Sequence, residues 1–257
     1  MANYLKSELY RVVRSRSVYL VVGACAVLML AMNVLLAAVR EGDPNFPYAN
    51  TGFVFGMMTS GMNIAMFTAL VFTSIIFAEE YKNRTMSNNL AFGLSETKVL
   101  LGKFIVTLLA SVPGMLVVEG VLVGSAYLLL EDSGIEELYA LLRANAACIP
   151  LFIAAISIYL AFIFWLKNEL RAIWVWLGVV MLGSQIVSLL GLKFQFFKWL
   201  SGWLIFELVS AYDFDEVTGE MYMIWDKAAG MTRAMSAGII TAIIFLVLGM
   251  IVTRKKA

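Results

Sequence analysis

Glu119 is the one acidic residue inside a long apolar run of this chain, in the segment VVEGVLVG. A charge at membrane depth costs several kcal/mol unless it is paired, hydrated or protonated. Two roles are therefore open to this side chain. It lies on a transport path or at a seam between subunits, or it forms a protonated hydrogen bond to a neighbouring helix.

A second candidate site is the charged segment 77–98, FAEEYKNRTMSNNLAFGLSETK, which separates two long apolar runs. Arg84 follows Glu80 by four residues, a spacing that favours an ion pair along one face of a helix. Gly93 suits the turn that ends such a helix, and Ser95 suits the N-cap of the next one. A simple connection needs only about 4–6 residues, so we interpret this helix-turn-helix as a docking element. The alternative is a solvated loop whose charge only sets the orientation of the chain.

Residue types that the sequence lacks exclude several kinds of site. There is no histidine, which excludes histidine metal sites and a Ser-His-Asp triad. There is no G-x-x-x-x-G-K-[ST] loop, the usual cradle for the phosphates of ATP. Cys25 and Cys148 both fall in apolar runs, which favours two small core residues over a disulfide. No basic stripe with interleaved aromatic residues indicates nucleic-acid binding.

The composition predicts an all-α integral membrane protein. Apolar residues make up 61% of the 257 residues and charged residues only 14%, too few polar groups to cover a soluble domain of this length. A membrane span needs about 20 mainly apolar residues, and its backbone groups are satisfied only within a helix. We therefore expect a single transmembrane domain over 1–257, with six helical spans at 18–39, 57–78, 104–130, 145–166, 173–192 and 234–253.

Charge predicts the orientation of these spans. Most of the 19 Lys and Arg lie in segments on the same side as the N-terminus, so the positive-inside rule predicts that both termini are cytoplasmic. Residues 1–16, MANYLKSELYRVVRSR, place Leu5, Leu9 and Val12 at helical spacing with basic residues around them. This pattern predicts an amphipathic helix on the membrane surface. The alternative is a basic anchor for the first span.

The segment 193–233 follows the fifth span and is expected on the outer side. Lys198 and Glu207 interrupt its apolar, aromatic first half. This favours a re-entrant pair of short helices, or a helix lying in the interface, over a seventh span. The DFDEVTGE sequence within the segment predicts a solvated turn.

The sequence resembles one family of membrane proteins over nearly its whole length. The run E-E-Y-K-N-R-T, followed by N-N-L, G-L-S and K-x-x-L-L-G-K, resembles the coupling segment of type-2 ATP-binding-cassette (ABC) transporter permeases. The opening Y-L-K-S-E-L-Y-R-V-V-R-S-R-S resembles the amphipathic connecting helix of those permeases. The six-span layout with a larger outer loop before the last span is similar as well. Arg84 stands where many relatives have glycine.

The resemblance implies a mechanism and a set of partners. Such permeases pair as homodimers or heterodimers in the bacterial cytoplasmic membrane, and each docks a separate ATPase subunit that binds the ATP and Mg²⁺. The permease is then not catalytic alone and holds no cofactor. It exports a hydrophobic or amphipathic substrate (a peptide, drug or lipid), for example in immunity to an antimicrobial peptide. By position, the ATPase-coupling residues within segment 79–98 are Glu79, Glu80, Tyr81, Arg84, Thr85, Gly93 and Ser95.

Two other functions compete with this interpretation. A proton-coupled secondary transporter or channel would use Glu119 and need no ATPase, but the sequence shows no inverted repeat of the kind such transporters carry. An intramembrane enzyme would need paired aspartates or a lysine at depth, and the predicted spans contain neither. The charged segment 77–98 favours the ABC permease, because a proton-driven carrier does not require it.

Overall fold

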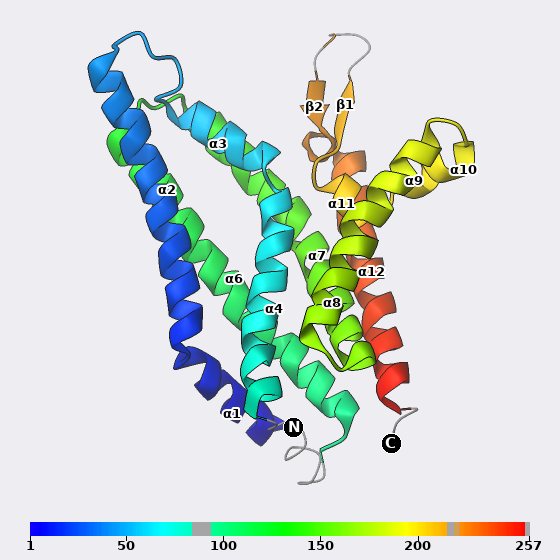
Figure 1. The fold of residues 1–257 in the computed structure, drawn as a ribbon. Helices are drawn as coiled ribbons and strands as arrows, with labels where there is room; N and C mark the ends of the chain where they lie inside the picture. The colour runs from blue at the N-terminus through cyan, green and yellow to red at the C-terminus, as the bar shows by residue number, and fades with distance from the viewer. Residues whose placement is uncertain (84–93, 215–218, 220, 255–257) are drawn as a thin grey trace.

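The computed structural model describes residues 1–83, 94–214, 219 and 221–254, and for residues 78–83 it describes only the helical backbone. The chain begins with helix α1 (Ala2–Val13), followed by the long helix α2 (Arg16–Gly42). Ser15 between them has an extended backbone, so α1 forms a separate element. It lies obliquely below the first turn of α2 (Figure 1).

The second predicted span, 57–78, is not one straight helix as expected. It consists of α3 (Thr51–Ser60) and α4 (Asn63–Asn83), which are bent by 65° at the break between them. Thr59 Oγ1 and Ser60 Oγ donate hydrogen bonds to the carbonyls of Phe55 and Gly56. Side chains that bond back to carbonyls four residues earlier weaken and bend helices. This local chemistry accounts for a break that hydrophobicity alone did not predict.

Two long helices follow, α6 (Glu96–Leu129) and α7 (Ile135–Leu166). The Ser95 hydroxyl accepts the backbone N–H of Lys98 and caps α6. Asn33 of α2 donates to Leu122 O at 3.0 Å and to Ser125 Oγ at 2.7 Å, which joins α2 to α6. Helix α7 is the centre of the molecule, because 89% of its most apolar window is buried among its neighbours.

The last third of the chain contains the remaining elements. Helix α8 (Glu169–Trp176), a π-helical turn η1 (Leu177–Leu182) and α9 (Gly183–Gly191) form one continuous helical segment. Two short helices, α10 (Gln195–Ser201) and α11 (Ile205–Leu208), come next. Strands β1 (Tyr212–Phe214) and β2 (Met221–Met223) pair antiparallel, with Asp213 opposite Tyr222. A 3₁₀ turn η2 (Ile224–Asp226) and helix α12 (Ala228–Arg254) complete the described chain. The hairpin β1–β2 was not predicted.

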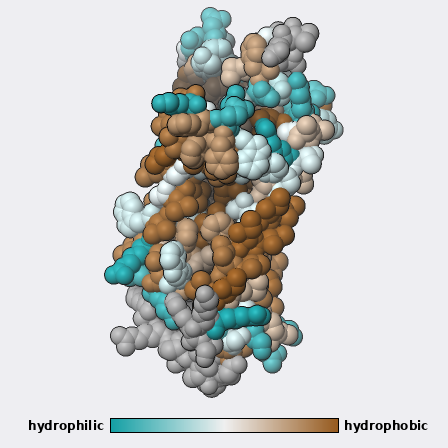
Figure 2. All heavy atoms as spheres, turned by 90° about the vertical axis from the view of Figure 1, so that its right-hand side faces the viewer, coloured by the Kyte–Doolittle hydropathy of each residue, from teal (hydrophilic) through white to brown (hydrophobic). Residues whose placement is uncertain are grey.

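Among the described residues, five helices are long and apolar enough to cross a membrane, or six if the bent pair α3–α4 is one span. Figure 2 shows apolar residues across the middle of one face of the molecule and hydrophilic residues nearer its ends. Helix α1 and the C-terminal ends of α4 and α12 lie at one end, whereas α10 and the hairpin lie at the other (Figure 1). The first of these ends is the one expected in the cytoplasm.

Candidate functional site

The predicted coupling residues lie mostly outside the described part of the chain. Arg84, Thr85 and Gly93 fall in the segment that is not described. Glu79, Glu80 and Tyr81 belong to the last turns of α4, of which only the backbone is described. Ser95 is described as the cap of α6. The structure therefore locates the two helices that enter and leave the coupling segment.

A buried ion-pair cluster lies where these two helices meet α1. The Glu8 carboxylate of α1 is 2.6 Å from Lys103 Nζ of α6 and 2.8 Å from Arg11 Nη2 of its own helix. The side chain of Glu8 is only 7% exposed and that of Lys103 is fully buried. One mostly buried carboxylate is thus shared between a fully buried cation and one that is 29% exposed.

The same cluster reaches the end of α4. Arg11 donates a hydrogen bond of 3.0 Å to the carbonyl oxygen of Ile76. Lys103 Nζ lies 5.3 Å from the ring centroid of Phe77, a cation–π distance. We call Glu8, Arg11, Lys103, Ile76 and Phe77 the Glu8 cluster. It joins α1 to both helices that flank the coupling segment.

Close packing beside the cluster fixes α1 against α6. A Cβ atom at Gly102 would lie 2.4 Å from Cε1 of Tyr4, so the two helices approach where α6 has no side chain. Tyr4 and Val12 are buried on the same face of α1 as Glu8. The connecting helix therefore packs on protein along this face, in addition to any contact of its outer face with lipid headgroups.

Further contacts attach the start of α6 to the rest of the molecule at this end. The hydroxyls of Thr97 and Thr253 are 2.9 Å apart and join α6 to α12. Lys167 Nζ, just after α7, is 3.2 Å from the carboxylate of Glu96. The first turns of α6 consequently contact α1, α7 and α12 before the helix enters the apolar region.

Glu119 forms the second candidate site, in the C-terminal half of α6. Its carboxylate accepts a hydrogen bond from the side-chain amide of Asn145 in α7. Both residues also line a cavity of about 190 Å³ bounded by α2, the α3–α4 bend, α4, α6 and α7. Glu119 therefore has an interhelical hydrogen bond and also borders a cavity within a single chain.

Sequence reasoning missed three residues of these sites. Glu8 carried a signal, because it lies four residues from Tyr4 and from Val12 and so shares the apolar face of the amphipathic helix. Lys103 directly precedes the predicted third span, where the sequence predicts only one of the charges that orient the chain. Asn145 had no signal, because its bond to Glu119 depends on how α6 and α7 pack.

The comparison with protein families now decides the identity of the chain. A family model described as "ABC-2 family transporter protein" matches residues 4–183, more than two thirds of the chain. The chain belongs to the ABC-2 transporter family. The resemblance to type-2 ABC permeases is thereby confirmed. Among proteins with curated descriptions, the comparison found no match.

Membership of the ABC-2 family establishes the general role of the chain. It is a transmembrane component of an ABC transporter, a multi-pass membrane protein that is not catalytic alone. The matched residues run from α1 to the start of α9. The Glu8 cluster, the coupling segment and Glu119 therefore all lie inside the part of the chain that defines the family.

Proposed function

We propose that this ABC-2 permease docks a separate ATPase subunit through α1 and the coupling segment 79–98, and that it exports a hydrophobic or amphipathic substrate. The observation that carries the proposal is the Glu8 cluster. It joins the amphipathic helix to the last described side chains of α4 and to the second turn of α6. A charged docking segment requires a partner of complementary charge, which an ATPase subunit would supply.

The cluster also provides a way to transmit movement. Helix α4 has 21 residues and is about 31 Å long at 1.5 Å per residue. It extends from the coupling segment to the bend beside the cavity. Because α1, α4 and α6 are held together at their cytoplasmic ends, a displacement of the coupling segment moves them as one unit. ATP and Mg²⁺ bind to the partner ATPase, since this sequence contains no phosphate loop.

The proposed assembly contains a second permease, either another copy of this chain or a homologous one, in the bacterial cytoplasmic membrane. Support comes from the family, because the resemblance implies that type-2 permeases act in pairs. The apolar walls of the cavity support a hydrophobic or amphipathic substrate over a highly charged one. Export of an antimicrobial peptide, a drug or a lipid fits this description.

The test is copurification of an ATPase with the tagged, full-length permease. We expect an ATPase subunit to accompany the wild type and to be lost from a Glu80→Lys, Arg84→Glu variant, because two charges of the docking segment are reversed. A Glu41→Lys variant is the matched control. It reverses a charge near the end of α2, away from the docking segment, and is expected to retain the ATPase.

One result would overturn the proposal. If no ATPase accompanies the wild type even after crosslinking in native membranes, the chain does not act through the coupling segment. A proton-coupled carrier that uses Glu119 would then be the leading explanation. Proton uptake by the purified permease, lost in Glu119→Gln, would identify it.

A further inference from the structure

The cavity beside Glu119 is elongated and mostly apolar. Most of its lining residues fall within 21–29 of α2, 64–72 of α4 and 114–122 of α6, and the others come from α3, the α3–α4 bend and α7. Each of these stretches spans eight helical steps, or about 12 Å at 1.5 Å per residue. Helix α2 lies at the periphery, with only 6% of its apolar window buried. A molecule dissolved in the bilayer therefore has a short path to the cavity.

The volume of the cavity limits what it can hold. An engineered apolar cavity of about 150 Å³ accommodates one benzene molecule, and this cavity measures about 190 Å³. It suits one aromatic ring with a short alkyl chain and is too small for a peptide. Four methionines (Met29, Met58, Met62 and Met115) line it. Their flexible thioethers adapt to irregular shapes and make favourable contacts with aromatic rings.

The polar groups that line the cavity determine which charge on a ligand the cavity would favour. Thr68 Oγ1 donates a hydrogen bond of 2.7 Å to the carbonyl oxygen of Ala65 in the same helix. Asn145 donates to the Glu119 carboxylate. No Lys or Arg lines the cavity in the part of the chain that the structure describes. The carboxylate thus has one neutral donor and no cation beside it within the cavity.

One amide hydrogen bond compensates the Glu119 carboxylate poorly, because a charge at membrane depth needs a partner of opposite charge, water or protonation. A ligand that carries a cation would supply the missing charge at one end and fill the apolar volume with its body. We infer that the cavity is a binding site for a small arylalkyl amine, held by Glu119 and Asn145 at its amine and by the methionines around its ring. This inference concerns one permease chain and does not depend on ATPase docking.

The test measures binding of tritiated 4-phenylbutylamine to the full-length permease in lipid nanodiscs, with empty nanodiscs as the background. Glu119→Gln removes the charge at nearly constant shape, and Ala65→Leu fills the cavity from its α4 wall. Glu207→Gln is the matched control, a partly buried carboxylate of α11 outside the cavity. We expect saturable binding to the wild type and the control. Binding to the other two variants should be weaker by about tenfold or more.

The neutral 4-phenyl-1-butanol provides a second comparison on the wild type alone. It has the same ring and chain without the cation, so we expect it to compete at least about tenfold less well than the amine. This comparison keeps the inference testable if Glu119→Gln fails to fold.

Four results would overturn the inference. Equal binding of amine and alcohol, or of the amine to wild type and Glu119→Gln, would show that an apolar molecule such as a lipid chain suffices. Unchanged binding to Ala65→Leu would place the amine elsewhere. Absence of saturable binding to the wild type would exclude the site, whether or not an ATPase copurifies with the permease.

Discussion

Glu8 pairs with two cations, the fully buried Lys103 and the partly exposed Arg11, at the end of the permease that is predicted to face the cytoplasm. Replacing a buried ion pair by apolar residues is often neutral for stability, but removing one partner costs about 3–5 kcal/mol. Such a cluster therefore fixes one arrangement of α1, α4 and α6 and adds little net stability. The proposed link between the docking segment and the transport path would require such a fixed arrangement.

Removing different members of the Glu8 cluster should cost different amounts of stability. Glu8→Gln removes the carboxylate that pairs with the buried Lys103 and with Arg11, and we expect a loss of about 3–5 kcal/mol in the free energy of unfolding. Lys103→Met leaves Glu8 with Arg11, so the loss should be smaller, about 1.5–3 kcal/mol. Unfolding of the purified permease in mixed micelles measures both.

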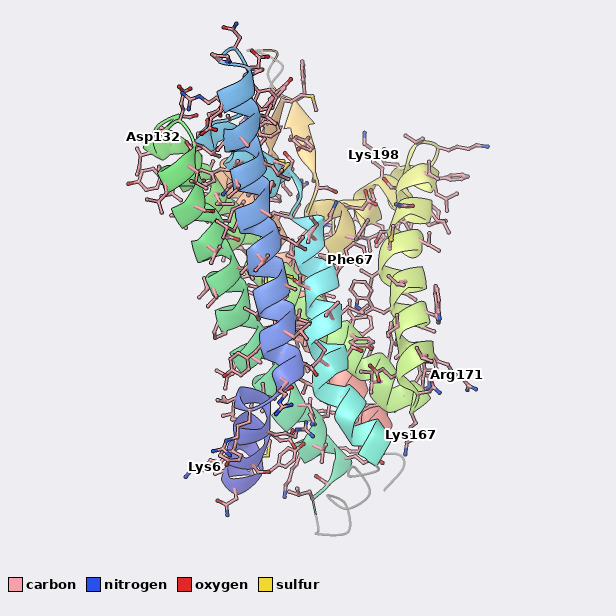
Figure 3. All side chains as sticks on the ribbon, turned by 60° about the vertical axis from the view of Figure 1, so that its left-hand side comes forward. Lys6, Phe67, Asp132, Lys167, Arg171 and Lys198 are labelled. Carbon is pink, nitrogen blue, oxygen red and sulfur yellow. The ribbon has the colours of Figure 1, made fainter. Side chains whose placement is uncertain are left out.

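Lys6→Met is the matched control for these variants. Lys6 is exposed on α1 (Figure 3). It lies two residues from Glu8, on the other side of the helix, so we expect little change in unfolding free energy. Equal losses for Lys6→Met and Lys103→Met would contradict the role assigned to the cluster.

Glu207 of α11, at the opposite end of the molecule, should make the stability of the permease depend on pH. Burial raises the pKa of this carboxyl above its ordinary value of 4.5, and a hydrogen bond with Ser188 partly opposes the shift. The fold therefore favours the protonated form. The contribution of Glu207 to stability is complete below pH 4.5 and is lost as the pH rises through the raised pKa.

We therefore expect wild type to lose more thermal stability than Glu207→Gln between pH 4.5 and pH 7.5. The glutamine variant should be the more stable of the two at pH 7.5. Melting temperatures at both pH values measure the difference, and parallel curves for the two proteins would show that Glu207 does not contribute.

At the scale of elements, α7 and α12 approach each other closely enough to bring their backbones together. A Cβ atom at Gly238 would lie 2.5 Å from the carbonyl carbon of Pro150 and 2.7 Å from Leu151 N. Those are backbone atoms, which cannot move without separating the helices. Small residues permit this kind of close approach between membrane helices.

Gly238→Ala is expected to destabilise the permease by about 1–3 kcal/mol through overpacking. Gly120→Ala is the matched control, because a Cβ atom there would meet nothing within 4 Å. Alanine favours a helix over glycine by up to about 1 kcal/mol, so the control should be neutral or slightly stabilising. Thermal unfolding of the two variants separates these cases, and equal behaviour would exclude close α7–α12 packing.

At the scale of the whole molecule, the arrangement of charges predicts which end faces the cytoplasm. Lys167 and Lys198 are exposed and lie at opposite ends (Figure 3). In a cysteine-free background made by replacing Cys25 and Cys148, we expect an impermeant maleimide to label Lys198→Cys in intact cells. Lys167→Cys should react only after permeabilisation. The reverse pattern would invert the proposed topology.

Much of the architecture was predictable because it depends on local physics. The length of an apolar run determines whether a helix can span a membrane, and α2, α6, α7 and α12 all enclose or nearly enclose a predicted span. A serine before a helix supplies its cap, and Ser95 does so in α6. The family resemblance was also present in short local patterns of the sequence.

The rest was decided only by the tertiary structure. Glu8 and Lys103 are 95 residues apart in the chain, and Glu119 and Asn145 are 26 residues apart on different helices. No local pattern specifies such partners, because each pair depends on the relative rotation and depth of two helices. The bend between α3 and α4 likewise brings its residues to a cavity shared with α2 and α6. The sequence determined a multi-span ABC-2 permease, and packing determined where its buried charges and its cavity lie.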